Sequence, residues 1–299
     1  MVNDIDDVTT GLVDEVEILD ESDNNKEGDW GQISSSSTEI DHNTEKYAHV
    51  NSGAEYTRIV DGPIHPSGSM EFRVTDLEIF KLFGEEEDDV ITVGETLPDY
   101  TVKISTSKGN HNEFTGVKFT SFSFNIARES PVTLSTDWMA ISVDQNSSSL
   151  DPDTPDKRFW TDLDVYVQID NDTVGIVDDL SIDMDRNAEH RRGISEKAET
   201  DRRGVDYIKQ DLIDLSLDMT IEITDDTAWD EADLDAEERE NKTITIIFAN
   251  EDKEIEVEGR FTATSDDKTD DADERLADLT GEIVENIQVK LDTSTTTTE

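Results

Sequence analysis

The sequence predicts a mainly β protein, a duplicated antiparallel β-sandwich or barrel with short flanking α-helices and a long inter-strand loop. Several segments alternate apolar and polar residues, which is the period of a strand with one buried face. One pair of such segments occurs twice in the same order, which indicates an internal duplication. Helical patterns are few and short, so we expect strands to dominate.

Residues 114–143 carry the clearest strand pattern. Phe122, Phe124 and Ile126 alternate with Ser and Asn. Residues 128–131 have turn composition, and the apolar run of residues 132–143 follows. The segment predicts a hairpin with one wet face and one apolar face.

The second copy of this hairpin is expected between residues 177 and 224. The alignment pairs three sets of segments: residues 119–128 with 177–186, 132–143 with 213–224, and 100–105 with 164–169. The two copies differ in their connection, which is a tight turn in the first and residues 187–210 in the second.

The predicted chain divides into four parts: an acidic N-terminal arm (1–45), a first β unit (46–150), a second β unit (151–291) and a polar C-terminal tail (292–299). Within the arm, the serine run at residues 34–37 predicts a flexible stretch. A short apolar pattern at residues 12–19 fits a strand or one helical turn. Residues 145–157, rich in Ser, Pro and Asp, are the expected linker between the units.

Two short helices are predicted. Thr75 and Glu78 form a capping-box pattern before an apolar run that ends at Gly84. A second helix is expected over residues 270–279. The remaining expected strands are 55–60, 69–74, 91–93, 99–106, 159–169, 243–249, 255–262 and 283–291, with a loop over 61–68.

The charge balance is extreme, with 75 acidic against 25 basic residues and a formal net charge of −50. Such charge is typical of disorder, but the alternating strands argue against disorder for most of the chain. Acidic residues that are spread over a folded chain indicate adaptation to molar salt. At that salt the Debye length is about 3 Å, so repulsion between the carboxylates is screened. The charge disfavours direct binding of nucleic acid.

The sequence offers no support for enzymatic or cofactor chemistry. It has no cysteine, and it contains no signal-peptide pattern and no apolar run long enough to span a membrane. No two histidines have zinc-ligand spacing, and the Asp183–Asp185 pattern lacks the Gly and Glu of a calcium loop. We therefore expect no catalytic residues, no cofactor, no metal and no membrane partner.

The connection between the strands of the second hairpin is unusually basic. Its cationic residues are Arg186, Arg191, Arg192, Lys197, Arg202, Arg203 and Lys209. Such a loop either pairs with its own acids or contacts the acidic surface of a neighbouring subunit. We favour the subunit contact, because exposed ion pairs contribute little at high salt and retained arginines suggest partly buried contacts.

Four motifs carry a family resemblance: FxGVKxxSFSF (residues 114–124), PVTLSxD (131–137), VDDLSIDMDR (177–186) and DLSLDMTIEI (214–223). The chain resembles the major tail tube proteins of long-tailed, siphovirus-like viruses over roughly residues 50–290. It is more loosely similar to the tube proteins of contractile injection machines. The acidity departs from usual members and indicates a virus of halophilic archaea.

The resemblance implies a structural virion protein that forms stacked rings around a channel through which DNA enters the host. Duplication favours a trimer with a pseudo-six-fold channel over a hexamer. The implied partners are other copies of the chain, the tape measure, the tail terminator and the baseplate, with DNA passing unbound. The implied location is the virion tail, assembled in the host cytoplasm. A halophilic adhesin-like binding module, or another tail ring such as a terminator or baseplate component, is the alternative.

Overall fold

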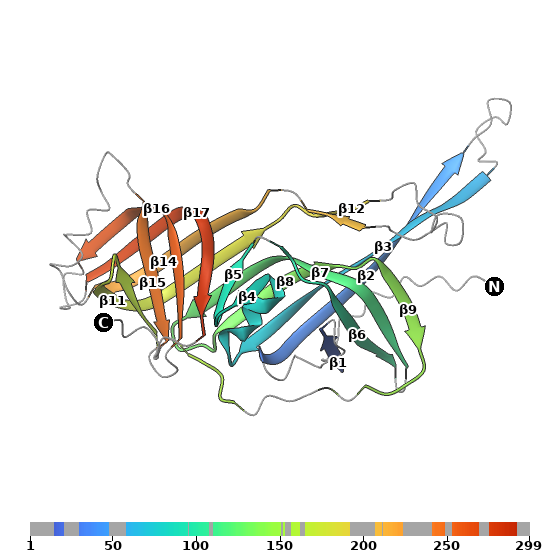
Figure 1. Ribbon diagram of the computed structural model, residues 1–299, viewed down its shortest axis with the longest axis horizontal. Helices are drawn as coiled ribbons and strands as arrows, with labels where there is room; N and C mark the ends of the chain where they lie inside the picture. The colour runs from blue at the N-terminus through green and yellow to red at the C-terminus, as the bar shows by residue number, and fades with distance from the viewer. Residues whose placement is uncertain are drawn as a thin grey trace.

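The computed structural model describes residues 15–20, 30–47, 58–94, 96–107, 110–150, 152, 157–161, 165–191, 207–210, 212–223, 241–248, 253–268 and 275–291. In these parts the chain is almost entirely antiparallel strand, which confirms the predicted mainly β class. We use "first half" for the described residues up to 150 and "second half" for those from 165 onward. The two halves lie side by side as two curled parts of one sheet (Figure 1).

The first half contains β1 (Val16–Leu19), β2 (Gly31–Tyr47), β3 (Arg58–Val74), the 3-10 helix η1 (Leu77–Leu82), β4 (Gly84–Glu87), β5 (Val90–Val93), β6 (Tyr100–Ser107), β7 (Asn110–Ala127), β8 (Thr133–Met139) and β9 (Ser142–Asn146). The second half contains β10 (Val165–Ile169), β11 (Asp172–Asp185), β12 (Glu189–Arg191), β13 (Tyr207–Lys209), β14 (Asp214–Ile223), β15 (Lys242–Phe248), β16 (Lys253–Lys268) and β17 (Arg275–Lys290).

One antiparallel run of strands crosses both halves in the order β2-β3-β8-β7-β11-β14-β17-β16. The halves join where β7 pairs with β11, and Phe124 lies opposite Ile182 at the centre of this junction. One face of the run is apolar. It is covered by η1, by the curled pair of strands β1 and β6, and by the curled pair β10 and β15 (Figure 1). The side chains of Phe119, Phe122 and Phe124 are buried on that face, as their alternation predicts.

The same pattern of strand pairs occurs twice, in chain order. In the first half β1 pairs with β6, β6 with β7, β7 with β8, β8 with β3 and β3 with β2. In the second half β10 pairs with β15, β15 with β16, β16 with β17, β17 with β14 and β14 with β11. The second half therefore repeats the first strand by strand, with β9 corresponding to the far end of β17.

Details of β2 and β11 place the two copies in register. Gly31 of β2 lies opposite Val74, and a bulge follows between Ile33 and Ser35. Gly175 of β11 lies opposite Ile223, and a bulge follows between Val177 and Asp179. The glycine-to-bulge spacing is the same in both strands, so β2 and β11 are equivalent elements.

The predicted duplication is thus present, but the predicted alignment of its copies is wrong. Of the aligned segments, residues 119–127 lie in β7, which corresponds to β16 rather than to β11. Residues 214–223 form β14, which corresponds to β3 rather than to β8. The alignment failed because β7 and β11 are neighbouring strands that bury the same side of the sheet. Apolar and polar residues therefore alternate in the same way in both strands. The unit boundaries at residues 45, 150 and 291 stay a prediction.

Several local predictions are also wrong. The N-cap of η1 is Asp76, not Thr75, and its carboxylate accepts from the backbone N–H of Glu78. Gly84 begins β4 instead of ending a helix. Residues 34–37 lie within β2, residues 61–68 lie within β3, and the described part of the predicted helix over 270–279 is strand β17. These segments are held in strands by long-range partners that local composition does not reveal.

Candidate functional site

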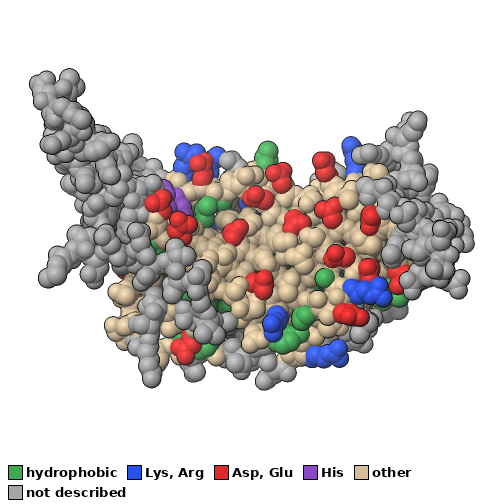
Figure 2. Space-filling model, turned by 180° about the vertical axis from the view of Figure 1, so that it is seen from behind, with side chains coloured by type: hydrophobic (Ala, Val, Ile, Leu, Met, Phe, Trp, Pro, Cys, Tyr) green, Lys and Arg blue, Asp and Glu red, His purple; other side chains and the backbone are tan. Residues whose placement is uncertain are grey.

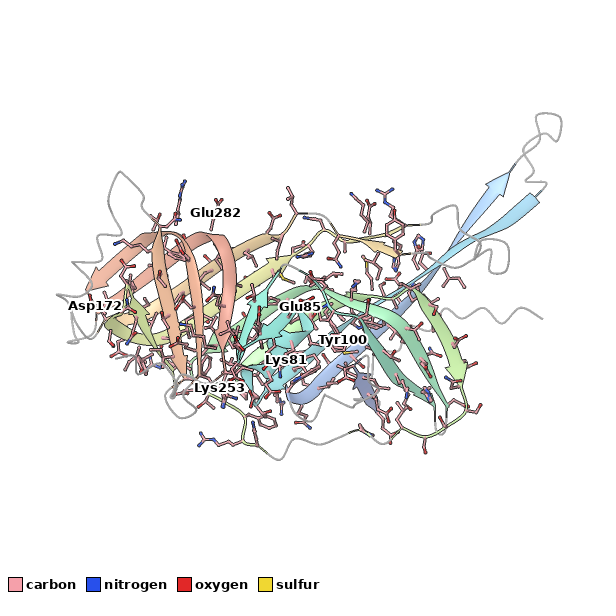
Figure 3. The ribbon with its side chains drawn as sticks, viewed as in Figure 1. Lys81, Glu85, Tyr100, Asp172, Lys253 and Glu282 are labelled. Atoms are coloured by element: carbon pink, nitrogen blue, oxygen red, sulfur yellow. The ribbon has the colours of Figure 1, made fainter. Side chains whose placement is uncertain are left out.

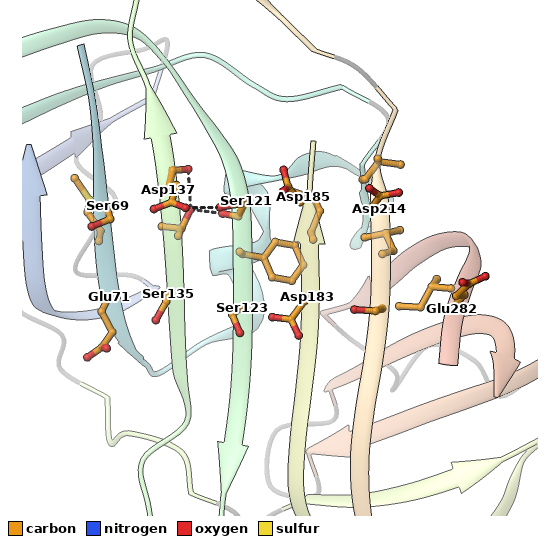
Figure 4. Close-up of a pocket in the computed structure, with 18 of the residues that line it drawn as sticks. Ser69, Glu71, Ser121, Ser123, Ser135, Asp137, Asp183, Asp185, Asp214 and Glu282 are labelled. Carbon is orange, nitrogen blue, oxygen red and sulfur yellow. Dashed lines mark hydrogen bonds between the residues drawn. The ribbon is translucent and has the colours of Figure 1, made fainter. Parts of the chain in front are cut away.

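The polar face of the sheet run is the main candidate site, and we call it the acidic face. It forms a shallow hollow of about 860 Å³ that spans both halves. Its polar lining residues are Ser35, Ser69, Glu71, Ser121, Ser123, Ser135, Thr136, Asp137, Asp183, Asp185, Asp214, Ser216 and Glu282. Figure 4 shows these side chains projecting from neighbouring strands.

Strand register sets the acidic face out in rows. One row of directly opposite residues crosses eight strands: Ser35, Glu71, Ser135, Ser123, Asp183, Ser216, Glu282 and Arg260. Side chains of opposite residues lie on the same side of a sheet. The alternation that buries the phenylalanines therefore also aligns the hydroxyls and carboxylates on the other side.

Hydroxyl groups hold several carboxylates of this surface in place. Ser121 Oγ donates to Asp137 Oδ2 at 3.0 Å, a bond visible in Figure 4. Ser34 Oγ, from the bulge of β2, donates to Glu71 Oε1 at 2.5 Å. Further along the same side of the sheet, Thr220 Oγ1 donates to Asp278 Oδ1 at 2.8 Å. Neutral donors therefore satisfy these acids without introducing positive charge.

Positive charge is missing from the lining of the acidic face. No Lys or Arg occurs among the described residues that line the hollow. Figure 2 shows Asp and Glu side chains spread over the surface with fewer Lys and Arg side chains. The hollow therefore lacks the cationic groups that supply most of the affinity for phosphate.

Three of the seven predicted contact residues are described, and they lie at the base of the long connection. Arg186 follows β11 and is buried, with its Nη1 donating to Gln210 Oε1 at 2.5 Å. Burial lowers the pKa of this guanidinium. Arg191 bonds to Glu189, and Lys209 Nζ lies 3.8 Å from the same carboxylate. The other four residues, Arg192, Lys197, Arg202 and Arg203, lie outside the described residues.

The base of this connection crosses onto the first half. The hairpin of β12 and β13 carries His190, whose ring stacks on His65 of β3 with centroids 4.8 Å apart. His190 Nε2 lies 2.9 Å from the carbonyl oxygen of Ala140. Burial lowers the pKa of His190, which favours the neutral ring in this contact. These histidines were not predicted, and no sequence spacing links residues so far apart.

Two apolar side chains at the same place are exposed. Tyr207 is 51% exposed and Leu212 is 88% exposed, which makes them two of the most exposed large hydrophobic residues described. Sequence reasoning singled out only the cations of this segment. An apolar component beside them marks the base of the connection as a candidate contact surface.

Comparison with known proteins decides the family. A family model described as phage tail tube protein matches residues 26–283, which is most of the chain. This chain belongs to the phage tail tube protein family. No curated protein matches it in a sequence comparison.

Membership establishes the general role of the tail tube protein. It is a structural component of the virion tail that assembles with copies of itself into a tube and works alongside other tail proteins.

The described helices include none that is long and apolar enough to cross a membrane.

Proposed function

We propose that three copies of this protein form a ring, that rings stack into a tail tube, and that the acidic face lines the channel for DNA ejection. The observation that carries the proposal is the acidic face itself. It runs unbroken across the β7–β11 junction, and its hollow is lined by carboxylates and hydroxyls with no Lys or Arg among the described lining residues.

Such a lining suits passage of DNA without binding. Phosphate contacts by Lys and Arg supply most non-specific affinity for DNA, and the lining has no such group. At molar salt, long-range repulsion is screened, so the lack of cationic donors matters more than the negative potential. The hollow therefore lacks the cationic groups that would hold the phosphates of the moving DNA most strongly.

The ring of three follows from the duplication. Each chain supplies two equivalent units side by side, so three chains supply six units around one axis. Copies that meet head to tail close into a ring when the rotation permits, and stacked rings give a filament.

We also propose that the tube belongs to a virus of halophilic archaea and is assembled in the host cytoplasm. In this proposal the tube contacts the tape measure, the terminator and the baseplate. We assign no catalytic activity.

The contact between rings is assigned to the base and tip of the connection after β11. The supporting features are the exposed Tyr207 and Leu212 beside Arg191 and Lys209. Arg186 acts within its own chain by holding Gln210, so its part in the contact is to position the base of the connection. The β2–β3 ribbon, the equivalent element of the first half, projects beyond the body (Figure 1).

Electron microscopy of the purified protein in molar KCl tests the ring. Rings or tubes with an open channel and three chains per ring are expected, and a protein that stays monomeric at high concentration contradicts the proposal. Deletion of residues 194–203 is expected to give rings that no longer stack. Tubes that still form after this deletion would remove the connection from the ring-to-ring contact.

A test of the lining uses a charge change on the acidic face. Asp183→Lys with Asp185→Lys places two cations on β11 at the channel surface, and we expect tubes of this variant to retain short duplex DNA that wild-type tubes release. Asp172→Lys, at the start of β11 outside the hollow, is the control. Equal DNA retention by both variants would argue against the acidic face as the lining.

A further inference from the structure

Two strand edges have no partner among the strand pairs of the described residues. Strand β2 pairs only with β3, so its other edge is open along Ser35 to Asp41. Strand β16 pairs with β15 over residues 253–259 on one side and with β17 on the other, so the β15 side of residues 260–268 is open. Both open edges belong to the run that carries the acidic face.

The equivalent edges in the middle of the chain are paired with each other. β7 corresponds to β16. One edge of β7 pairs first with β6 and then, beyond the end of β6, with residues 179–185 of β11. β11 corresponds to β2. The pairing of β7 with β11 within the chain is therefore an example of the strand contact that its two open edges lack.

We infer that β16 of one protomer pairs antiparallel with β2 of the next, in the register that β7 and β11 use within the chain. This inference rests on the proposed ring and names the surface that closes it. The occupant of each edge is a second copy of this chain. Among the described strands, β16 is the one whose internal equivalent, β7, pairs with the equivalent of β2, which is β11.

The equivalent rows fix the register of this contact. In the first half, the row that starts at Ser35 after the β2 bulge runs through Glu71 and Ser135 to Ser123. In the second half, the row that starts at Asp179 after the β11 bulge has the following members: Asp179, Thr220, Asp278 and Ser265. Ser265 therefore corresponds to Ser123.

The partner of Ser265 follows by the same logic. Ser123 lies opposite Asp183, which is four residues after Asp179 along β11. The residue four positions after Ser35 along β2 is Glu39. Ser265 of one protomer is thus placed opposite Glu39 of the next, a Ser–acid pair like Ser123 and Asp183.

Direction and chemistry agree with this pairing. Neighbouring strands alternate in direction along the run from β2 to β16, so a second β2 beside β16 continues the alternation. Soluble proteins protect free sheet edges with Lys, Pro or inward charges. Residues 35–41 of β2 contain no Lys, Arg or Pro. The charges in this segment are the carboxylates of Glu39 and Asp41, and an edge without Lys or Pro is suited to a partner strand.

Disulfide trapping tests the register, and the native chain has no cysteine to interfere. The double variant Glu39→Cys with Ser265→Cys is oxidised mildly in molar KCl after assembly. Covalent dimers and trimers are expected on a non-reducing denaturing gel, because directly opposite residues lie within reach of a disulfide. Ser123→Cys with Asp183→Cys is the matched control and is expected to close within one chain, leaving a monomer.

A shifted pair tests specificity. Asp41→Cys with Ser265→Cys lies two residues out of register, roughly 7–8 Å apart, and is expected to link poorly. Rings that form without Glu39–Ser265 linkage, or that link equally in both pairs, overturn the inference while the proposed function stands. Failure of the wild-type protein to form any ring counts against the proposed function instead.

A measurement on the unmodified protein covers the case in which the cysteine variants fail to fold. Hydrogen exchange in wild-type rings and monomers is compared for the amides of residues 35–41 and 263–268. Both segments are expected to gain protection on assembly, since pairing removes their amides from water. Unchanged exchange in either segment of assembled rings overturns the inference.

Discussion

The carboxylate of Asp76 accepts a hydrogen bond from the ammonium of Lys253, which lies 177 residues further along the chain. Both groups are buried. Asp76 is also the N-cap residue of η1, and its carboxylate accepts a hydrogen bond from the ammonium of Lys157. Figure 3 shows Lys253 near the boundary of the two halves. One carboxylate thus connects the helix of the first half with the first residue of β16 in the second.

Replacing Asp76 with Ala is expected to lower the free energy of unfolding by about 3–5 kcal/mol, because Lys253 then stays buried without the opposing carboxylate. Urea unfolding in molar KCl measures the change. The control is Arg128→Ala, which removes an exposed pair with Asp178 and is expected to cost less than about 1 kcal/mol. Equal losses in the two variants would contradict a special role for the buried pair.

The same carboxylate gives a pH dependence at the acid end. Burial alone raises the pKa of Asp76, but hydrogen bonds from Lys157 and Lys253 outweigh it and hold the pKa below 3.8. The unfolded state therefore takes up a proton first, and the stability from this group is lost as pH falls below that value. Relative to Asp76→Asn, the wild type is expected to lose stability between about pH 5 and pH 2. A constant difference over that range would exclude this contribution.

His190 gives a second pH dependence, at a milder pH. Burial lowers its pKa below 6.5, so the unfolded chain binds a proton more readily than the folded one. The contribution of the neutral His190 is complete above pH 6.5 and declines as pH falls below it. His190→Phe keeps an aromatic ring against His65 without a titrating group. Wild-type unfolding is expected to become easier relative to this variant as pH falls below 6.5, and parallel curves below that pH would contradict the prediction.

Much of the fold follows from the sequence because local alternation carries it. The turn at residues 128–131 and the buried Phe122, Phe124 and Ile126 are where the pattern predicts them. The repeat register was not accessible in this way. A period of two fits any two strands of one face, whereas the correct equivalence of β2 with β11 depends on a shared bulge that only paired strands reveal.

The candidate site was predictable in kind but not in place. The wet positions of each strand are Ser, Thr, Asp and Glu in the sequence, yet their union into one acidic face needs the β7–β11 pairing. The basic residues illustrate the opposite case. Composition marks Arg186 as a surface contact, whereas burial and its bond to Gln210 depend on how the chain returns after residue 206.

The repeated glycines give a prediction that tests the equivalence of the halves. A Cβ on Gly31 would lie 2.2 Å from the carbonyl oxygen of Arg73, and a Cβ on Gly175 would lie 2.3 Å from that of Glu222. Both contacts are with backbone, which cannot move aside as a side chain can. Gly31→Ala and Gly175→Ala are each expected to cost about 1–3 kcal/mol in urea unfolding. Ser35→Ala, exposed in the same strand as Gly31, serves as the control and is expected to change stability by less than about 0.5 kcal/mol. Two glycine variants that differ widely from each other would show that β2 and β11 do not play the same structural part.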